Sequence, residues 1–128
     1  MGIKELVIES HQNAVDHGWW EGERNFGEQI ALMHSELSEV LEEFRNKRDY
    51  TEVYFTHKGE SPCNPVHFEN QINKECDQRK PEGIPIEFAD VLIRIFDTCG
   101  KYGIDLEEAV KIKMEYNKHR PYRHGKKI

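Results

Sequence analysis

The sequence predicts an all-α helical bundle, and three observations carry this expectation. Apolar residues recur at helical spacing in four segments, capping residues precede two of these segments, and Gly and Pro gather between them. The chain has 128 residues, of which 33% are charged, as is typical of one globular domain. We therefore expect four main helices in a single domain over residues 1–128.

The first two helices follow from apolar stripes and a cap. A short amphipathic helix is expected over residues 3–17, ending near Gly18. A longer helix is expected over residues 26–46, because Asn25 and Glu28 form an N-cap and capping-box pair ahead of it. Its apolar side chains follow the i, i+4, i+7, i+11, i+14 stripe of a helix packed along one side: Phe26, Ile30, Met33, Leu37, Val40, Leu41 and Phe44.

Residues 49–83 break the helical pattern and are expected to form a long loop or insertion. Three prolines and two glycines punctuate a polar stretch there, and connections of this length are often functional. Residues 51–55 (TEVYF) allow one short strand. Cys63, His67 and Cys76 can be read as zinc ligands or as unpaired loop residues, and their spacing matches no common zinc site.

The last two helices are also bounded by local signals. Pro85 suits the first turn of a third helix over residues 86–102, which ends at Gly103. Asp105 and Glu108 form a second capping pair, and a fourth helix is expected over residues 106–119, before Pro121. The third helix is apolar on most of its surface, so we expect it to be largely buried.

The acidic residues of helix 86–102 are the anomaly of the sequence. Glu87 and Asp90 lie one turn apart on an apolar helix, and buried acids are costly unless they are paired or bind a metal. Glu36 and Glu39 repeat this spacing on the second helix, followed by Glu43. If the two helices pack antiparallel, four carboxylates meet, and a divalent cation relieves their repulsion. Oxygen ligands favour Mg²⁺ or Mn²⁺, and the ExxH motifs of a di-iron bundle are missing from both pairs.

Charge is distributed unevenly along the chain. The net charge of −6 argues against binding to nucleic acid or anionic lipid, yet residues 111–128 carry +6 and the remainder −12. An acidic body with a basic tail suits a ligand that brings a metal and phosphates, while the tail alone is also explained as a solvated C-terminus. Asp97 is read either as a further metal ligand or as a partner of Arg94 or of a tail cation. Trp19 and Trp20 form a packing clamp or stack on a base.

Cysteine usage and hydropathy indicate the compartment. The three cysteines form no CxxC pair and are odd in number, which argues against a secreted disulfide framework. No apolar run approaches the ~20 residues that a membrane span needs, and the N-terminus has no apolar signal region. We expect a cytoplasmic protein that does not associate with a membrane.

Together, these motifs resemble the MazG-like, all-α nucleoside triphosphate pyrophosphohydrolase superfamily. The matching stretches make up about a third of the chain and lie on both central helices and the last one: HSELSEVLEEFR (34–45), PIEFADVLIRIFD (85–97), GIDLEEA (103–109) and KMEYNKHR (113–120). The resemblance implies a helical, usually oligomeric enzyme that uses Mg²⁺ to cleave a nucleotide between its α and β phosphates. Its catalytic and metal-ligand positions fall on Glu36, Glu39, Glu87 and Asp90, and its phosphate-binding positions on Lys113, Asn117 and Arg120.

The expected function is therefore hydrolysis of a ribo- or deoxyribonucleoside triphosphate to the monophosphate and pyrophosphate, by a homo-oligomer of two or four chains. Glu43 is a candidate for orienting the attacking water. The segment 49–83 is longer than in the simplest family members, which leaves the substrate and the oligomer geometry open. The alternatives are a related helical hydrolase with a dedicated substrate, such as dUTP or a phosphoribosyl nucleotide, and a non-catalytic helical interaction protein that keeps the fold.

Overall fold

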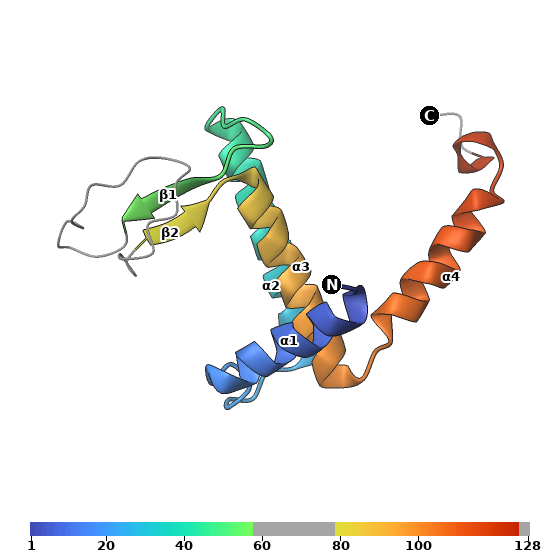
Figure 1. The fold of residues 1–128 in the computed structure, drawn as a ribbon, viewed down its shortest axis with the longest axis horizontal. Coiled ribbons are helices and arrows are strands. Elements are labelled where there is room, and N and C mark those ends of the chain that lie inside the picture. Colours follow the sequence, from blue (N-terminus) through green and yellow to red (C-terminus); the bar gives the residue numbers. More distant parts are fainter. Residues whose placement is uncertain (58–78, 126–128) are drawn as a thin grey trace. The chain divides into compact units, whose positions relative to one another are not determined.

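A computed structural model describes residues 1–57 and 79–125 (Figure 1). Within these residues, the elements are α1 (Ile3–Asp16), α2 (Phe26–Arg45), β1 (Tyr54–His57), β2 (Arg79–Glu82), α3 (Ile84–Tyr102), α4 (Leu106–Lys118) and the short 3₁₀ helix η1 (Tyr122–Gly125). The prediction of an all-α fold with four main helices is confirmed, with one small two-stranded sheet added.

Capping side chains set the helix ends close to where the sequence predicts them. The Asn25 side chain accepts a hydrogen bond from the Glu28 N–H at 2.8 Å, and the Asp105 side chain accepts one from the Glu108 N–H at 3.1 Å. Helix α3 begins at Ile84, two residues earlier than expected, so that Pro85 lies within its first turn. No helix of the described residues has the length and apolar character needed to cross a membrane.

The described residues group into two compact units, one made of residues 1–24 and 95–125, the other of residues 25–57 and 79–94. Helix α3 contributes its second half to the first unit and its first half to the second. In the first unit, α1 packs closely on α3: a Cβ added at Gly100 would lie 2.5 Å from the His11 Cβ, so this approach requires glycine. The side chains of Phe96 and Cys99 are buried in this unit.

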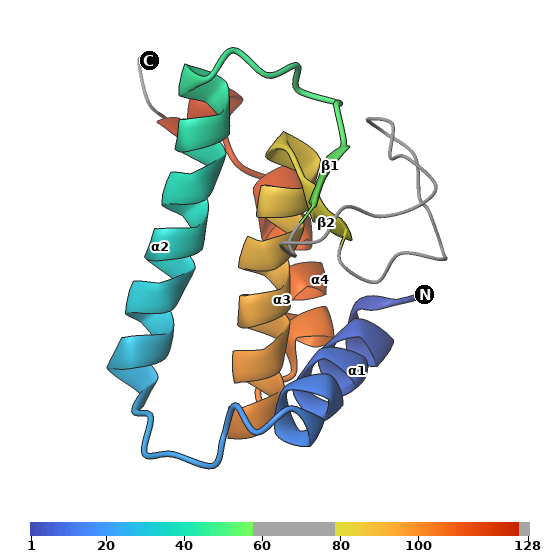
Figure 2. The same cartoon turned by 90° about the vertical axis from the view of Figure 1, so that its left-hand side faces the viewer.

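In the second unit, α2 and the first half of α3 lie side by side and run in opposite directions (Figures 1 and 2). Strands β1 and β2 pair antiparallel, with Tyr54 opposite Glu82 and His57 opposite Arg79. The sequence allows one strand at residues 51–55, but β1 begins three residues later. Strand β2, with the sequence RKPE, was not predicted, because Lys, Pro and Glu are uncommon in strands.

The expectation that helix 86–102 is largely buried is wrong for its first half. Phe88 and Leu92 remain 49% and 50% exposed, whereas the side chains of residues 96–99 are buried. One neighbouring helix covers only one side of an all-round apolar helix. The first half of α3 therefore keeps an uncovered apolar face.

Candidate metal centre

Three carboxylates from two helices meet in the second unit. Glu36 of α2 and Glu87 and Asp90 of α3 each offer an oxygen atom, and these three atoms all lie within 4.8 Å of one another. All three side chains are partly buried. The grouping follows from the i, i+3 spacing of Glu87 and Asp90, which places both on one side of α3.

The contacts between α2 and α3 run in opposite order along the two helices. Glu36, in the middle of α2, accepts a hydrogen bond from the Nε of Arg94 at 2.9 Å. Glu43, near the end of α2, lies close enough to Glu87, near the start of α3, to raise the pKa of Glu87. This order is that of antiparallel helices, and it brings the two acidic motifs to the same level.

Burial and mutual repulsion shift the proton equilibria of this group. Burial raises the pKa of Glu87 from 4.5 to about 7, and the negative charges of Asp90 and Glu39 add to the shift. Burial also raises the pKa of Asp90, and the charge of Glu36 acts in the same direction. A bound cation would offset both causes, and a set of oxygen donors suits a hard divalent ion.

Glu39, the fourth expected ligand, lies at the edge of this group. Its side chain is exposed, and it is not one of the three carboxylates within 4.8 Å of one another. Residues three apart are offset by roughly 60° around a helix, so the rotation of α2 against α3 decides whether one or both members of the Glu36 and Glu39 pair reach the group. After burial and the charge of Asp90, the charge of Glu39 nevertheless contributes to the raised pKa of Glu87.

The three residues expected on the phosphate side belong to the first unit. Lys113 and Asn117 lie on α4, and Arg120 follows its C-terminus. The Lys113 Nζ lies 4.7 Å and the Arg120 guanidinium carbon 5.5 Å from the centre of the Tyr116 ring, so the two cations approach the same aromatic side chain. Their role toward phosphate stays a prediction.

Asp97 has partners that the sequence did not indicate. Its carboxylate accepts a hydrogen bond from the Trp20 indole N–H at 2.9 Å and lies 2.9 Å from the His11 Nδ1. Trp20 also meets the rings of His11 and Tyr102 edge-on, which agrees with the packing-clamp interpretation. These partners are distant in sequence, and no local pattern marks them.

Tyr54 is a neighbour of Glu43 that sequence reasoning missed. Its hydroxyl oxygen lies 2.8 and 2.9 Å from the two carboxylate oxygens of Glu43, and the side chain is only 7% exposed. The residue falls in the stretch that the sequence predicts as a loop. The alternation of TEVYF indicates a strand, but not its partner.

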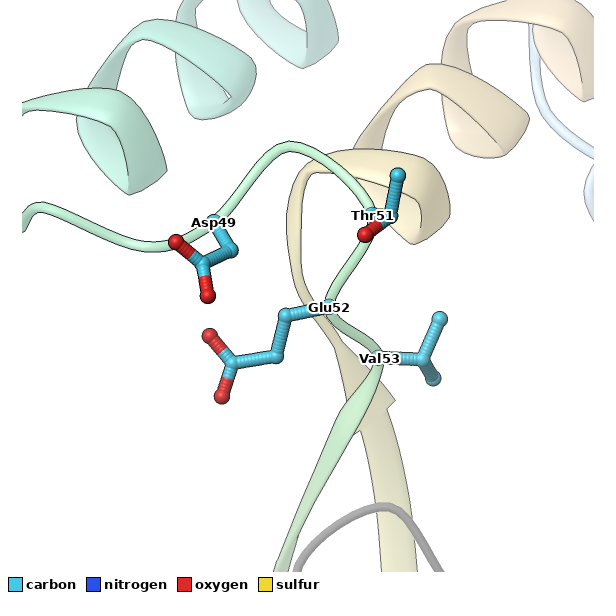
Figure 3. A pocket seen from close by; sticks show the side chains of 4 residues that line it. All are labelled: Asp49, Thr51, Glu52 and Val53. Atoms are coloured by element: carbon cyan, nitrogen blue, oxygen red, sulfur yellow. The ribbon is translucent and has the colours of Figure 1, made fainter.

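A surface hollow of about 510 Å³ lies where the chain turns into β1, lined by Asp49, Thr51, Glu52 and Val53. The carboxylates of Asp49 and Glu52 point to the same side of this segment (Figure 3). Arg48 forms an ion pair with Glu52 at 3.2 Å. The hollow shares no residue with the three-carboxylate group.

The zinc interpretation of Cys63, His67 and Cys76 concerns residues outside the described ranges. No protein-family model, no curated protein and no solved structure matches the chain.

Proposed function

We propose that this chain is a cytoplasmic, Mg²⁺-dependent nucleoside triphosphate pyrophosphohydrolase of the MazG-like type. In the proposed reaction, the oxygen of a water molecule bonds to a phosphorus atom, the bridging bond between the α and β phosphates breaks, and the nucleoside monophosphate and pyrophosphate leave. The observation that supports it most is the meeting of Glu36, Glu87 and Asp90 within 4.8 Å on two antiparallel helices.

The raised pKa values of this group favour a cation-binding site over a solvent-exposed acidic patch that binds no ion. Exposed acidic pairs keep ordinary proton equilibria, whereas burial and neighbouring carboxylates raise the pKa of Glu87 to about 7. Mg²⁺, with Mn²⁺ as a substitute, suits such a set of oxygen donors. When bound, the cation would neutralise phosphate oxygens and stabilise the charge that develops on the leaving pyrophosphate.

The residues of the site have distinct roles in this proposal. Four carboxylates hold the cation, and Arg94 restrains one of them through its 2.9 Å hydrogen bond to Glu36. Glu43 neighbours the group without belonging to it and orients the attacking water. Cations on and after α4 contact the phosphates, because carboxylates alone repel a polyphosphate. The residues in these tasks are Glu36, Glu39, Glu87 and Asp90 for the cation, and Lys113, Asn117 and Arg120 for the phosphates.

The exposed apolar surface supports a homo-oligomer of two or four chains. Leu37, Leu41 and Phe44 of the α2 stripe are about half exposed, as are Phe88 and Leu92 of α3. Exposed apolar side chains at helical spacing are typical of helix faces that pack on another chain. Light scattering at micromolar concentration should give twice 15.1 kDa or more, and a monomer mass would refute the oligomer.

A nucleotide panel assayed for pyrophosphate tests the activity. The wild-type chain should release pyrophosphate from at least one nucleoside triphosphate with Mg²⁺ and none with a chelator. Asp90→Asn should lose this activity, because an amide replaces a charged ligand of the same size. Glu42→Gln is the matched control, since Glu42 is exposed on the same helix as Glu36 and is assigned no ligand role. A folded wild-type chain that cleaves no nucleotide would favour the non-catalytic interaction protein.

A further inference from the structure

Tyr54 connects strand β1 to helix α2. Its hydroxyl lies 2.8 and 2.9 Å from the carboxylate oxygens of Glu43. Burial raises the pKa of Tyr54 to about 12, and the hydrogen bond to Glu43 and its negative charge act in the same direction, so the phenol keeps its proton at neutral pH. The protonated phenol therefore donates a hydrogen bond to the Glu43 carboxylate.

Glu43 occupies a defined place beside the candidate metal centre. It follows Glu36 by seven residues, or about two helical turns, and therefore lies on the same side of α2. Its negative charge contributes to the raised pKa of Glu87, yet it is not one of the three carboxylates within 4.8 Å of one another. The Glu43 carboxylate, next to the three-carboxylate group but outside it, is in a position to orient a water molecule.

Contacts on the ring face hold Tyr54 in place. The Arg48 guanidinium carbon lies 3.8 Å from the centre of the Tyr54 ring, and Arg48 is itself paired with Glu52 at 3.2 Å. The aromatic ring is therefore covered by a cation that the preceding turn restrains. The hydroxyl group remains directed at Glu43.

The backbone fixes the hairpin to the start of α3. Gly83 has a φ of +120°, and a Cβ added there would lie 2.3 Å from the Glu52 carbonyl oxygen, so only glycine fits this crossing. The Gly83 carbonyl then accepts the Glu87 N–H at 2.9 Å. Residue 54 pairs with Glu82, directly before this glycine. The same crossing thus places Tyr54 and the first carboxylate of α3.

We propose that Tyr54 is a positioning residue, which holds the Glu43 carboxylate in the orientation that directs the attacking water. Strand β1 then contributes to the hydrolytic site through Tyr54, which contacts Glu43 and is not itself one of the three carboxylates. This inference rests on the proposed pyrophosphohydrolase function.

Tyr54→Phe tests the inference because it removes the hydroxyl and keeps the ring under Arg48. We expect kcat to fall about 10- to 100-fold, the effect of losing one hydrogen bond to a charged group, while KM and the Mg²⁺ dependence change less than about twofold. Tyr50→Phe is the matched control, since Tyr50 lies in the same connecting segment and is 72% exposed. Its kcat should equal that of the wild type.

A double-mutant cycle shows whether Tyr54 acts through Glu43. In a Glu43→Gln background, adding Tyr54→Phe should change kcat less than about twofold, because the contact is already broken. Additive losses would overturn the inference. So would a Tyr54→Phe variant that unfolds at a lower temperature and keeps the wild-type kcat, as a purely structural role requires.

A measurement without nucleotide separates this inference from the proposed function. The ¹³C resonance of the Glu43 carboxyl, assigned with Glu43→Gln, should shift in Tyr54→Phe and stay unchanged in Tyr50→Phe. An unchanged resonance in Tyr54→Phe would refute the contact. An active wild type with an equally active Tyr54→Phe overturns the positioning role alone, whereas an inactive wild type overturns the proposed function and this role with it.

Discussion

Asp90 and Asp97 lie two turns apart on helix α3, and their surroundings are opposite. Asp97 is 6% exposed and accepts a hydrogen bond from Trp20, with His11 Nδ1 at 2.9 Å. An oxygen of Asp90 lies within 4.8 Å of oxygens of Glu36 and Glu87, and burial and the charge of Glu36 raise the pKa of Asp90. A buried carboxylate surrounded by donors completes a structure, while one surrounded by carboxylates needs a cation or a proton. One helix thus carries an acid with structural contacts, Asp97, and an acid that we propose to be functional, Asp90.

The largest expected effect is a loss of pyrophosphate release when a carboxylate of the proposed metal centre is replaced, but not when Asp97 is replaced. Glu87→Gln should lower Mg²⁺-dependent turnover by about 100- to 1000-fold, because it removes a charge that the bound cation requires. Asp97→Asn should keep the wild-type kcat per folded molecule. Turnover is measured as pyrophosphate release at saturating nucleotide, normalised to the folded fraction. Equal losses in both variants would remove the distinction.

The next effect tests whether residues in the unit of Asp97 also serve catalysis. Lys113→Ala and Arg120→Ala should each lower kcat/KM about 10- to 100-fold, since each loses a charge-assisted contact to phosphate. Lys118→Ala serves as a control, because Lys118 is exposed and pairs with Glu115 on the same helix. If Lys113→Ala and Arg120→Ala instead unfold at a lower temperature with unchanged kinetics, Lys113 and Arg120 stabilise the fold and do not bind phosphate.

Asp97→Asn should mainly affect stability. The substitution weakens the contacts to Trp20 and His11 by about 1.5–3 kcal/mol, which corresponds to a fall in Tm of roughly 5–10 °C for a chain of this size. Glu87→Gln in the metal-free protein should instead keep or raise Tm, since it relieves repulsion. Thermal unfolding followed by circular dichroism measures both values. A larger fall in Tm for Glu87→Gln would reverse the assignment.

The smallest effect is a pH dependence of the metal-free protein. Because the pKa of Glu87 is raised from 4.5 to about 7 on folding, the folded state binds more protons than the unfolded state between these values. Below about pH 4.5, Glu87 does not lower the free energy of unfolding. Its destabilising effect grows between about pH 4.5 and pH 7 and stays constant above that. Metal-free Glu87→Gln should therefore lose less Tm than the wild type between pH 5 and 8. Equal slopes in the two proteins would contradict a repulsive cluster.

Local chemistry explains how much of the fold the sequence predicted. The first residues of α2 and α4 were predicted correctly because Asn25 and Asp105 cap these N-termini through neighbours three residues away. The carboxylate group was predicted from two i, i+3 pairs and from the assumption of antiparallel packing. By contrast, the displacement of Glu39 depends on how α2 is rotated against α3, which no spacing within one helix determines.

The missed contacts depend on partners that sequence does not pair. Asp97 and His11 are 86 residues apart, whereas the sequence suggests metal binding or a pairing with Arg94 or a tail cation for Asp97. Tyr54 reaches Glu43 because β1 pairs with β2, a strand that contains a proline and little strand-forming sequence. Such contacts arise from tertiary packing that overrides local propensity.

Cation binding by the three-carboxylate group is tested most directly by titrating the protein with Mn²⁺ and following free Mn²⁺ by electron paramagnetic resonance. The wild-type chain and Asp97→Asn should bind Mn²⁺ with the same Kd, and Mg²⁺ should displace it. Asp90→Asn should weaken binding at least about tenfold. Equal Mn²⁺ affinity in all three proteins, or no binding by the wild type at millimolar Mn²⁺, would contradict a metal centre at Glu36, Glu87 and Asp90.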